Sequence, residues 1–359
     1  MRLGITAGSY ADGKINVGAV LEAERLGYDS VWSAEAYGSD AVSPLAYLAA
    51  KTSRIKLGTG IMQLAGRSPA NCAMTMSTLD ALSGGRVLVG LGLSGPQVVE
   101  GWHGVPYRRP LAWLREYICI LRAIWAREDP VEFDGEIYQL PYRGPDASGL
   151  GKPLKTTLHP RQLPIYLATM GPLNMRLTGE IADGWLPIWI SPYQPQLFKP
   201  MLEEGFHRAG SGKSWRDFDL AARCRVAIGD DVQACLDRLK PRFALYVGGM
   251  GARGRNFYND SAVKLGYADA AATIQDLYLA GRKDEATAAV PDELVDELCL
   301  CGPTARIRQR FRAWEDMGAS TLIVESGQPE AFALMAELAG LASASSAASA
   351  TIERDGGLS

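Results

Sequence analysis

The chain has 359 residues, of which 47% are apolar, with only three histidines and six cysteines. Its formal net charge of −3, with both signs interspersed, gives no electrostatic reason to expect a nucleic-acid partner. The cysteines lie scattered in apolar segments, so we expect reduced thiols packed as small core residues, no metal site and a cytoplasmic location. No apolar run reaches the length of a membrane span, and a strand is predicted almost at residue 1, which leaves no room for a signal peptide.

Short β-branched segments alternate with longer helical segments along the chain. We predict eight strands, at residues 3–7, 30–34, 55–61, 86–91, 164–169, 184–189, 219–228 and 320–324. We predict helices between them, among others at 16–26, 44–52, 69–82, 111–125, 173–181 and 291–314. Eight βα units with both sheet faces covered predict an α/β fold, a (β/α)₈ TIM barrel that forms a single domain over residues 1–342. A doubly wound parallel sheet is the alternative.

Local signals mark several of these helices. In the segment 111–125 apolar residues recur at steps of three and four, which predicts one buried stripe made of Leu111, Leu114, Ile118, Leu121 and Trp125. Pro44 and Pro69 stand where a first helical turn tolerates proline, and Gly27 and Gly84 stand where helices end.

Three segments go beyond a minimal barrel. Residues 129–163 and 242–283 are long excursions rich in Gly, aromatic and basic residues, and we expect such insertions at the mouth of the barrel, where substrates bind. Basic residues in or beside these two segments are candidates for contact with an anionic ligand, with solvated surface charge as the alternative. They are Lys152, Lys155, Arg161, Lys240, Arg242, Arg253 and Arg255. Residues 343–359 form an Ala- and Ser-rich tail that is predicted to be mobile.

Residues 90–95 spell G-x-G-x-x-G directly after a predicted strand, a pattern typical of dinucleotide-binding sites. Three observations argue against that interpretation. The motif follows the fourth strand instead of the first, Pro96 comes directly after Gly95, and the segment about 20 residues later is helical where a strand-end carboxylate is required. In a barrel the same glycines lie at the catalytic mouth, where a flat ring could approach the backbone and Ser94 could bond it.

Three segments together resemble the luciferase-like flavin and deazaflavin oxidoreductases, in the branch that uses coenzyme F-420. They are LEAERLGYDSVWSAEAYGSDAVSPLAYLA at 21–49, IKLGTGIMQLAGRSPANCAMTMSTLDALSGGRVLVGLGLSGPQVVEGWHGVPY at 55–107 and GKPLKTTLHPRQLPIYLATMGPLNMRLTGEIADGWLP at 151–187. The resemblance implies a (β/α)₈ barrel with the isoalloxazine-like ring at its mouth, a homodimer, and hydride transfer between the deazaflavin and a small organic substrate. An FMN-dependent monooxygenase and a deazaflavin-binding protein without turnover are the alternatives.

The resemblance also implies roles for individual residues. Glu35 would contact the deazaflavin headgroup and take part in catalysis; alternatively, it would cap the next helix or pair with a base. Family members often have a histidine at the next position, where this chain has Ala36. Gly60 and Ile61 would form a cis peptide behind the ring. Thr169, Met170 and Gly171 precede a helix whose N-terminus would seat the coenzyme phosphate.

The remaining candidates lie after the fourth strand and at predicted strand ends. Ser94, Gly95 and Gln97 would contact the ring. His103 could hold or supply a proton, with a structural bond to a loop as the alternative. The aromatic residues that could line a substrate pocket are Trp102, Tyr107, Trp189 and Tyr246.

Overall fold

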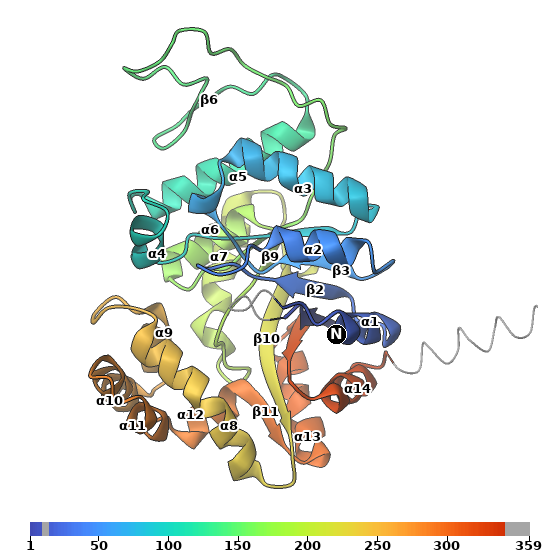
Figure 1. Cartoon of the computed structure of the whole chain (residues 1–359), viewed down its shortest axis with the longest axis vertical. Helices are drawn as coiled ribbons and strands as arrows, with labels where there is room; N and C mark the ends of the chain where they lie inside the picture. The colour runs from blue at the N-terminus through green and yellow to red at the C-terminus, as the bar shows by residue number, and fades with distance from the viewer. Residues whose placement is uncertain (9–13, 342–359) are drawn as a thin grey trace, which may run out of the picture.

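The computed structural model describes residues 1–8 and 14–341, so the predicted tail at 343–359 lies outside the described residues. Eight parallel strands close into a barrel inside a layer of helices (Figure 1). Each strand pairs with the next, and the last pairs with both its predecessor and the first. The strands are β1 (Arg2–Thr6), β2 (Ser30–Ser33), β3 (Lys56–Thr59), β5 (Val87–Gly92), β8 (Ile165–Leu167), β9 (Gly184–Trp185), β10 (Asp219–Ile228) and β12 (Thr321–Glu325).

All eight predicted strands overlap one of these barrel strands, and the predicted TIM barrel is confirmed. The doubly wound alternative is excluded, because an open sheet would leave two unpaired edges whereas β12 pairs with β1 from Arg2↔Thr321 to Ile5↔Val324. The barrel interior is filled by Trp32, Leu88, Tyr166, Leu186, Ala221 and Ile323. The rings of Trp32 and Tyr166 meet edge to face at 5.2 Å.

The helices that follow the barrel strands cover its outside. They are α1 (Val17–Arg25), α2 (Val42–Ala49), α3 (Pro69–Ser83), α4 (Pro96–Gly101), α5 (Pro110–Ala126), α6 (Pro172–Ile181), α7 (Lys199–Ala209), α8 (Val232–Ala244), α13 (Thr304–Asp316) and α14 (Pro329–Leu338). The predicted end signals hold, since Pro69 opens α3 and Gly84 ends it in the left-handed conformation at φ 72°. The predicted stripe of α5 is buried except for Leu111, which is half-buried.

The predicted helix at 291–314 is wrong, because the structure divides it. Helix α12 (Asp292–Leu298) is followed by a strand, β11 (Cys299–Gly302), before α13 begins. Strand β11 pairs with the C-terminal half of β10, from Arg225↔Cys299 to Ile228↔Gly302, and only Arg225 pairs with both β11 and β12. Four buried residues are too few for hydrophobic periodicity to distinguish a strand from a helix. The pairing with β10, which is remote in sequence, determines that this segment is a strand.

The first excursion, 129–163, lies along the outside of the barrel and not over its mouth. It contains a small hairpin of β6 (Phe133–Asp134) and β7 (Gln139–Leu140). Glu116 on α5 accepts hydrogen bonds from the backbone of residues 136–138, and Arg161 pairs with Asp80 on α3. These contacts attach the excursion to the helical layer, so it adds no residue to the cavity described below.

The second excursion, 242–283, starts at the mouth. It continues α8 through a π-helical turn at Leu245–Gly249 into α9 (Phe257–Lys264) and α10 (Ala268–Leu279), which α11 (Lys283–Ala288) follows. A second small core forms here, separate from the barrel interior, with Phe243, Val247, Ile274 and Leu294 among its members. This excursion therefore does reach the site.

The cysteine prediction is confirmed for five residues and wrong for one. Cys72, Cys224, Cys235, Cys299 and Cys301 are buried free thiols, whereas Cys119 is exposed on α5. Within residues 1–8 and 14–341, none of the helices has the length and apolar character that crossing a membrane would take.

Candidate functional site

A cavity of about 1050 Å³ opens at the carboxyl ends of the barrel strands. Its lining includes residues at or after β2, β3, β5, β8, β9, β10 and β12, which is where barrel enzymes place their sites. Most of the predicted site residues line it, namely Glu35, Gly60, Ile61, Ser94, Gly95, Gln97, Tyr107, Thr169, Met170, Gly171, Trp189 and Tyr246. His103 and Trp102 do not.

The glycines of residues 90–95 meet different structural requirements. A Cβ on Gly90 would stand 1.7 Å from the carbonyl oxygen of Thr59, and the Thr59 hydroxyl bonds both the N–H and the C=O of Gly90 at 2.8 Å. Gly90 therefore allows β5 to pack against β3 and does not face a ligand. Gly92 does line the cavity, and Ser94 has a left-handed φ of 63°.

The Gly60–Ile61 peptide is cis, as predicted. Its Gly60 carbonyl oxygen accepts a 2.6 Å hydrogen bond from Nη2 of Arg223 on β10. Since β3 and β10 are the third and seventh of the eight barrel strands, Arg223 reaches across the mouth to hold this peptide. The cis peptide, with the Ile61 side chain beside it, forms one wall of the cavity.

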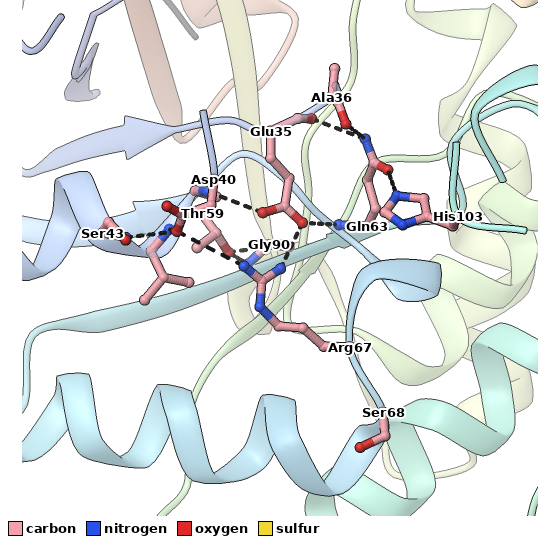
Figure 2. A network of polar contacts seen from close by, with 12 residues as sticks. Glu35, Ala36, Asp40, Ser43, Thr59, Gln63, Arg67, Ser68, Gly90 and His103 are labelled. Atoms are coloured by element: carbon pink, nitrogen blue, oxygen red, sulfur yellow. Dashed lines mark hydrogen bonds and ion pairs between the residues drawn. The ribbon is translucent and has the colours of Figure 1, made fainter. Parts of the chain in front are cut away.

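Glu35 is surrounded by donors (Figure 2). Its Oε1 accepts from Nη1 of Arg67 at 2.7 Å and from the backbone N–H of Gln63 at 2.9 Å, and its Oε2 accepts from the N–H of Ala41 at 3.0 Å. The Glu35 and Arg67 side chains are only 10% and 16% exposed. These contacts correspond to the alternative role predicted for Glu35, in which it caps the start of α2 and forms an ion pair with a basic residue. The contact of Glu35 with a ring and its part in catalysis stay predictions.

The ring of His103 lies beside the Gln63 side chain, as Figure 2 shows, and His103 is not among the residues that line the cavity. The Gln63 amide nitrogen donates to the carbonyl of Ala36 at 2.9 Å, so its oxygen accepts from Nε2 of His103 at 2.7 Å. The observed bond is of the structural kind, to a buried side chain that itself lines the site. A proton-transfer role for His103 stays a prediction, and its path to a substrate would have to pass Gln63.

The segment after β8 leads into α6. Thr178 donates its hydroxyl proton to the carbonyl of Asn174, so the hydroxyl of Thr169, 2.8 Å from that of Thr178, donates to Thr178. The Thr169 hydroxyl could therefore accept a hydrogen bond from a ligand but not donate one. Gly171 is the residue before the first turn of α6, and Pro172 opens it. Asn174 lines the cavity, and its Oδ1 is a buried acceptor that has no partner among the described residues. The N-terminus of α6 thus presents backbone donors and one unused acceptor.

Sequence reasoning missed an ion cluster at the ends of β10 and β12. Glu325 Oε1 lies 3.0 Å from Nη1 of Arg223, and its Oε2 lies 2.6 Å from Nη2 of Arg225. Burial opposes ionisation of Glu325, but the charges of Arg223, Arg225 and Arg242 outweigh it and hold the pKa of Glu325 below its ordinary value. A signal was present: two arginines alternate with apolar residues in a predicted strand, and a glutamate directly follows another.

Comparison with known proteins gives matches over most of the chain. The family model described as luciferase-like monooxygenase matches residues 3–321. A Mycobacterium tuberculosis protein named provisionally as a coenzyme F-420-dependent oxidoreductase is 46% identical over 313 residues, which cover 87% of this chain and 90% of that protein. The 5,10-methylenetetrahydromethanopterin reductase of Archaeoglobus fulgidus is 27% identical over 307 residues, 85% of this chain and 87% of the reductase.

Solved structures with the same fold fall into two groups. The coenzyme F-420-dependent tetrahydromethanopterin reductase from Methanopyrus kandleri superimposes with a TM-score of 0.76 at 22% identity, covering 93% of this chain and 97% of that one. The oxygenating component of a 3,6-diketocamphane monooxygenase from Pseudomonas putida, in complex with FMN, has a TM-score of 0.63 at 20% identity, covering 95% and 96%. Likenesses at such identities speak for the fold alone.

Proposed function

Because the chain belongs to the luciferase-like monooxygenase family of enzymes, we propose that it is an oxidoreductase that moves a hydride between coenzyme F-420 and a small organic substrate. The relative that is 46% identical and bears the name of an F-420-dependent oxidoreductase supports the choice of coenzyme. The observation that carries the proposal is the cavity, where the Gly60–Ile61 wall, Gly92 and the N-terminus of α6 line a single space.

The residues present fit such a coenzyme. Gly92 leaves room for the side chain of Ile61, whose Cδ1 would lie 2.9 Å from a Cβ at position 92. The two residues together line the cavity with an apolar surface on which a flat ring could lie, and the left-handed Ser94 begins the turn beside it. The free N–H groups at the start of α6 suit a phosphate, and the unpartnered Oδ1 of Asn174 suits a hydroxyl donor of the ligand. When bound, the deazaflavin would supply the hydride chemistry.

The chain itself would orient and enclose the reactants. Arg223 fixes the Gly60 carbonyl of the supporting wall, and the Glu35–Arg67 pair fixes Gln63 in the same wall through its backbone N–H. These are positioning residues. Tyr107 and Tyr246 line the cavity and carry hydroxyls that could hold a proton near a substrate, and burial raises the pKa of Tyr107 so that it stays protonated.

Titration with coenzymes tests the proposal. Purified protein should bind oxidised F-420 at least 100-fold more tightly than FMN, and the deazaflavin absorbance should change when a competent substrate is added. Tight FMN binding with no response to F-420 would assign the chain to the monooxygenases. F-420 binding that gives no turnover with any reducible or oxidisable substrate would favour a binding protein.

A substitution at Asn174 tests whether F-420 binds in this cavity. Asn174→Leu should weaken F-420 binding about 10-fold, because the buried acceptor would be lost, as expected for one hydrogen bond to a ligand. Asn71→Leu, on the exposed surface of α3, is the matched control and should bind as the parent does. The proposal includes the homodimer that the family resemblance implies, and sedimentation velocity tests it.

A further inference from the structure

The charged residues that line the cavity are strongly unbalanced in sign. Among the residues that the structure describes, they are five arginines and two glutamates, namely Arg223, Arg225, Arg238, Arg242, Arg255, Glu35 and Glu325. Glu35 is neutralised by Arg67, which lies outside the lining. Five positive charges thus face one negative charge, in a chain whose formal net charge is −3. A half-enclosed space lined by one sign of charge concentrates ligands of the other sign.

Three of these arginines lack an acidic partner. Arg223 and Arg225 share Glu325, but over the described ranges no carboxylate forms an ion pair with Arg238, Arg242 or Arg255. Arg242 is half-buried, and its Nη2 donates only to the neutral hydroxyl of Tyr246, at 3.0 Å. Its guanidinium carbon lies 4.8 Å from the centroid of the same ring, so the side chain is held in place. The charge of Arg242 does act on Glu325, but Glu325 forms its ion pairs with Arg223 and Arg225 and none with Arg242. A bound anion would therefore stabilise the half-buried guanidinium of Arg242.

An aromatic wall stands directly beside Arg242. Trp189, which has a left-handed φ of 57°, stacks on Phe243 at 4.8 Å with the ring planes 16° apart. The rings of Tyr246 and Tyr258 lie 5.6 and 5.5 Å from Trp189 and 4.7 Å from each other. All four rings line the cavity. Helix α8 and the turn after it carry Arg242, Phe243 and Tyr246, whereas Trp189 follows β9 and Tyr258 lies on α9. These segments together present a cation and aromatic rings to the same space.

We infer that this part of the cavity is a subsite for an amphipathic acid, a substrate with an aromatic or alkyl body and a carboxylate. Arg242 would bind the carboxylate with its planar donor fork, aided by the field of the neighbouring arginines, and the aromatic wall would cover the body. Calling the ligand a substrate rests on the proposed function; the binding itself does not. Coenzyme F-420 carries a polyglutamate tail, which offers the same carboxylate chemistry. A polar chain of that kind would gain little from contact with four aromatic rings.

Binding of a matched pair of probes tests the subsite. We would titrate 4-phenylbutyrate and its uncharged analogue 4-phenylbutyramide calorimetrically at pH 7.5, into the protein alone and saturated with F-420. The acid should bind at least 10-fold more tightly than the amide. Arg242→Leu should abolish that preference, and Arg242→Lys should keep part of it. Arg253→Leu is the control, because Arg253 lies in the same excursion but pairs with Asp276 and does not line the cavity.

Other outcomes overturn the inference in distinguishable ways. Equal binding of acid and amide by folded parent protein would show that the arginines select no anion. If tri-γ-glutamate competes with 4-phenylbutyrate, or if Arg242→Leu weakens F-420 but not a deazaflavin that lacks the tail, the cluster is a coenzyme-tail site. If the protein does not bind F-420 but still prefers the acid to the amide, the proposed function is wrong and the subsite is supported. Thermal unfolding of each variant excludes a folding defect.

Discussion

At the scale of single residues, the partners of a side chain decide what it can do. The position of Glu35 after the second strand predicts a carboxylate at the mouth, and the structure places it there. Yet both of its oxygens are engaged by Arg67 and by backbone N–H groups. A carboxylate with these bonds organises the wall of a site, and the bonds favour its ionised form over the protonated one.

A double-mutant cycle measures this pair. Glu35→Gln and Arg67→Met should each lower the free energy of unfolding by about 3 kcal/mol, because each leaves a largely buried partner unpaired. The double variant should be more stable than the sum predicts by at least about 1 kcal/mol in urea unfolding. Arg115→Gln, which breaks the more exposed pair with Glu180, should cost less than about 1 kcal/mol. Strict additivity of the two changes would mean that the pair contributes no coupling.

At the scale of elements, the approach of two neighbouring strands sets which residues are tolerated. Thr59 at the end of β3 and Gly90 in β5 bond each other through the Thr59 hydroxyl, and there is no room between them for a side chain. The first glycine of the G-x-G sequence, Gly90, is therefore required by strand packing. The second, Gly92, lines the cavity and leaves room for the side chain of Ile61.

Two glycine-to-alanine substitutions distinguish the effect of packing on stability from the effect of glycine's backbone flexibility. Gly90→Ala should destabilise the protein by about 3 kcal/mol or more, because the new Cβ would overlap a backbone oxygen that a strand pairing holds in place. Gly101→Ala, on an exposed turn of α4 with no atom within 4 Å of the new Cβ, should be neutral or stabilising by up to about 1 kcal/mol. Chemical denaturation of both variants would decide, and equal stabilities would contradict the packing argument.

At the scale of the whole molecule, one ion cluster connects distant parts of the barrel. Glu325 and Arg225 are direct partners in the register of β12 and β10, and Arg223 extends the cluster to Gly60 beyond β3. The structure of the mouth thus depends on Glu325 being ionised.

The cluster predicts how stability should vary with pH. Because the pKa of Glu325 is lowered in the folded chain, its contribution is present above the ordinary glutamate pKa and is lost as pH falls through the folded value. Glu325→Gln should therefore be less stable than the parent at pH 7, and the difference should shrink steadily below about pH 4.5. Urea midpoints of both proteins between pH 7 and pH 3 provide the measurement. A difference that stays constant over that range would assign the loss to packing.

Much of the fold and part of the site could be predicted from local patterns. The eight barrel strands and the catalytic mouth follow from alternation of short and long apolar segments. Strand β11 could not be predicted, because CLCG is ambiguous until β10 pairs with it. The candidates at residues 94–97 and 169–171 do line the cavity, whereas His103 faces Gln63 and Trp102 is 65% exposed. Which way a loop side chain turns depends on neighbours that are remote in sequence.

The sequence alone therefore determined the order of the elements, the barrel, the family resemblance and the edge at which the site lies, since these depend on periodicity and local motifs. Only the tertiary structure decided that Glu35 is bound by Arg67, that five arginines share one cavity with an aromatic wall, and that Arg223 holds a carbonyl 163 residues away. The physical reason is closure of the barrel, which brings distant strand ends within hydrogen-bonding distance and has no counterpart in any short stretch of the chain.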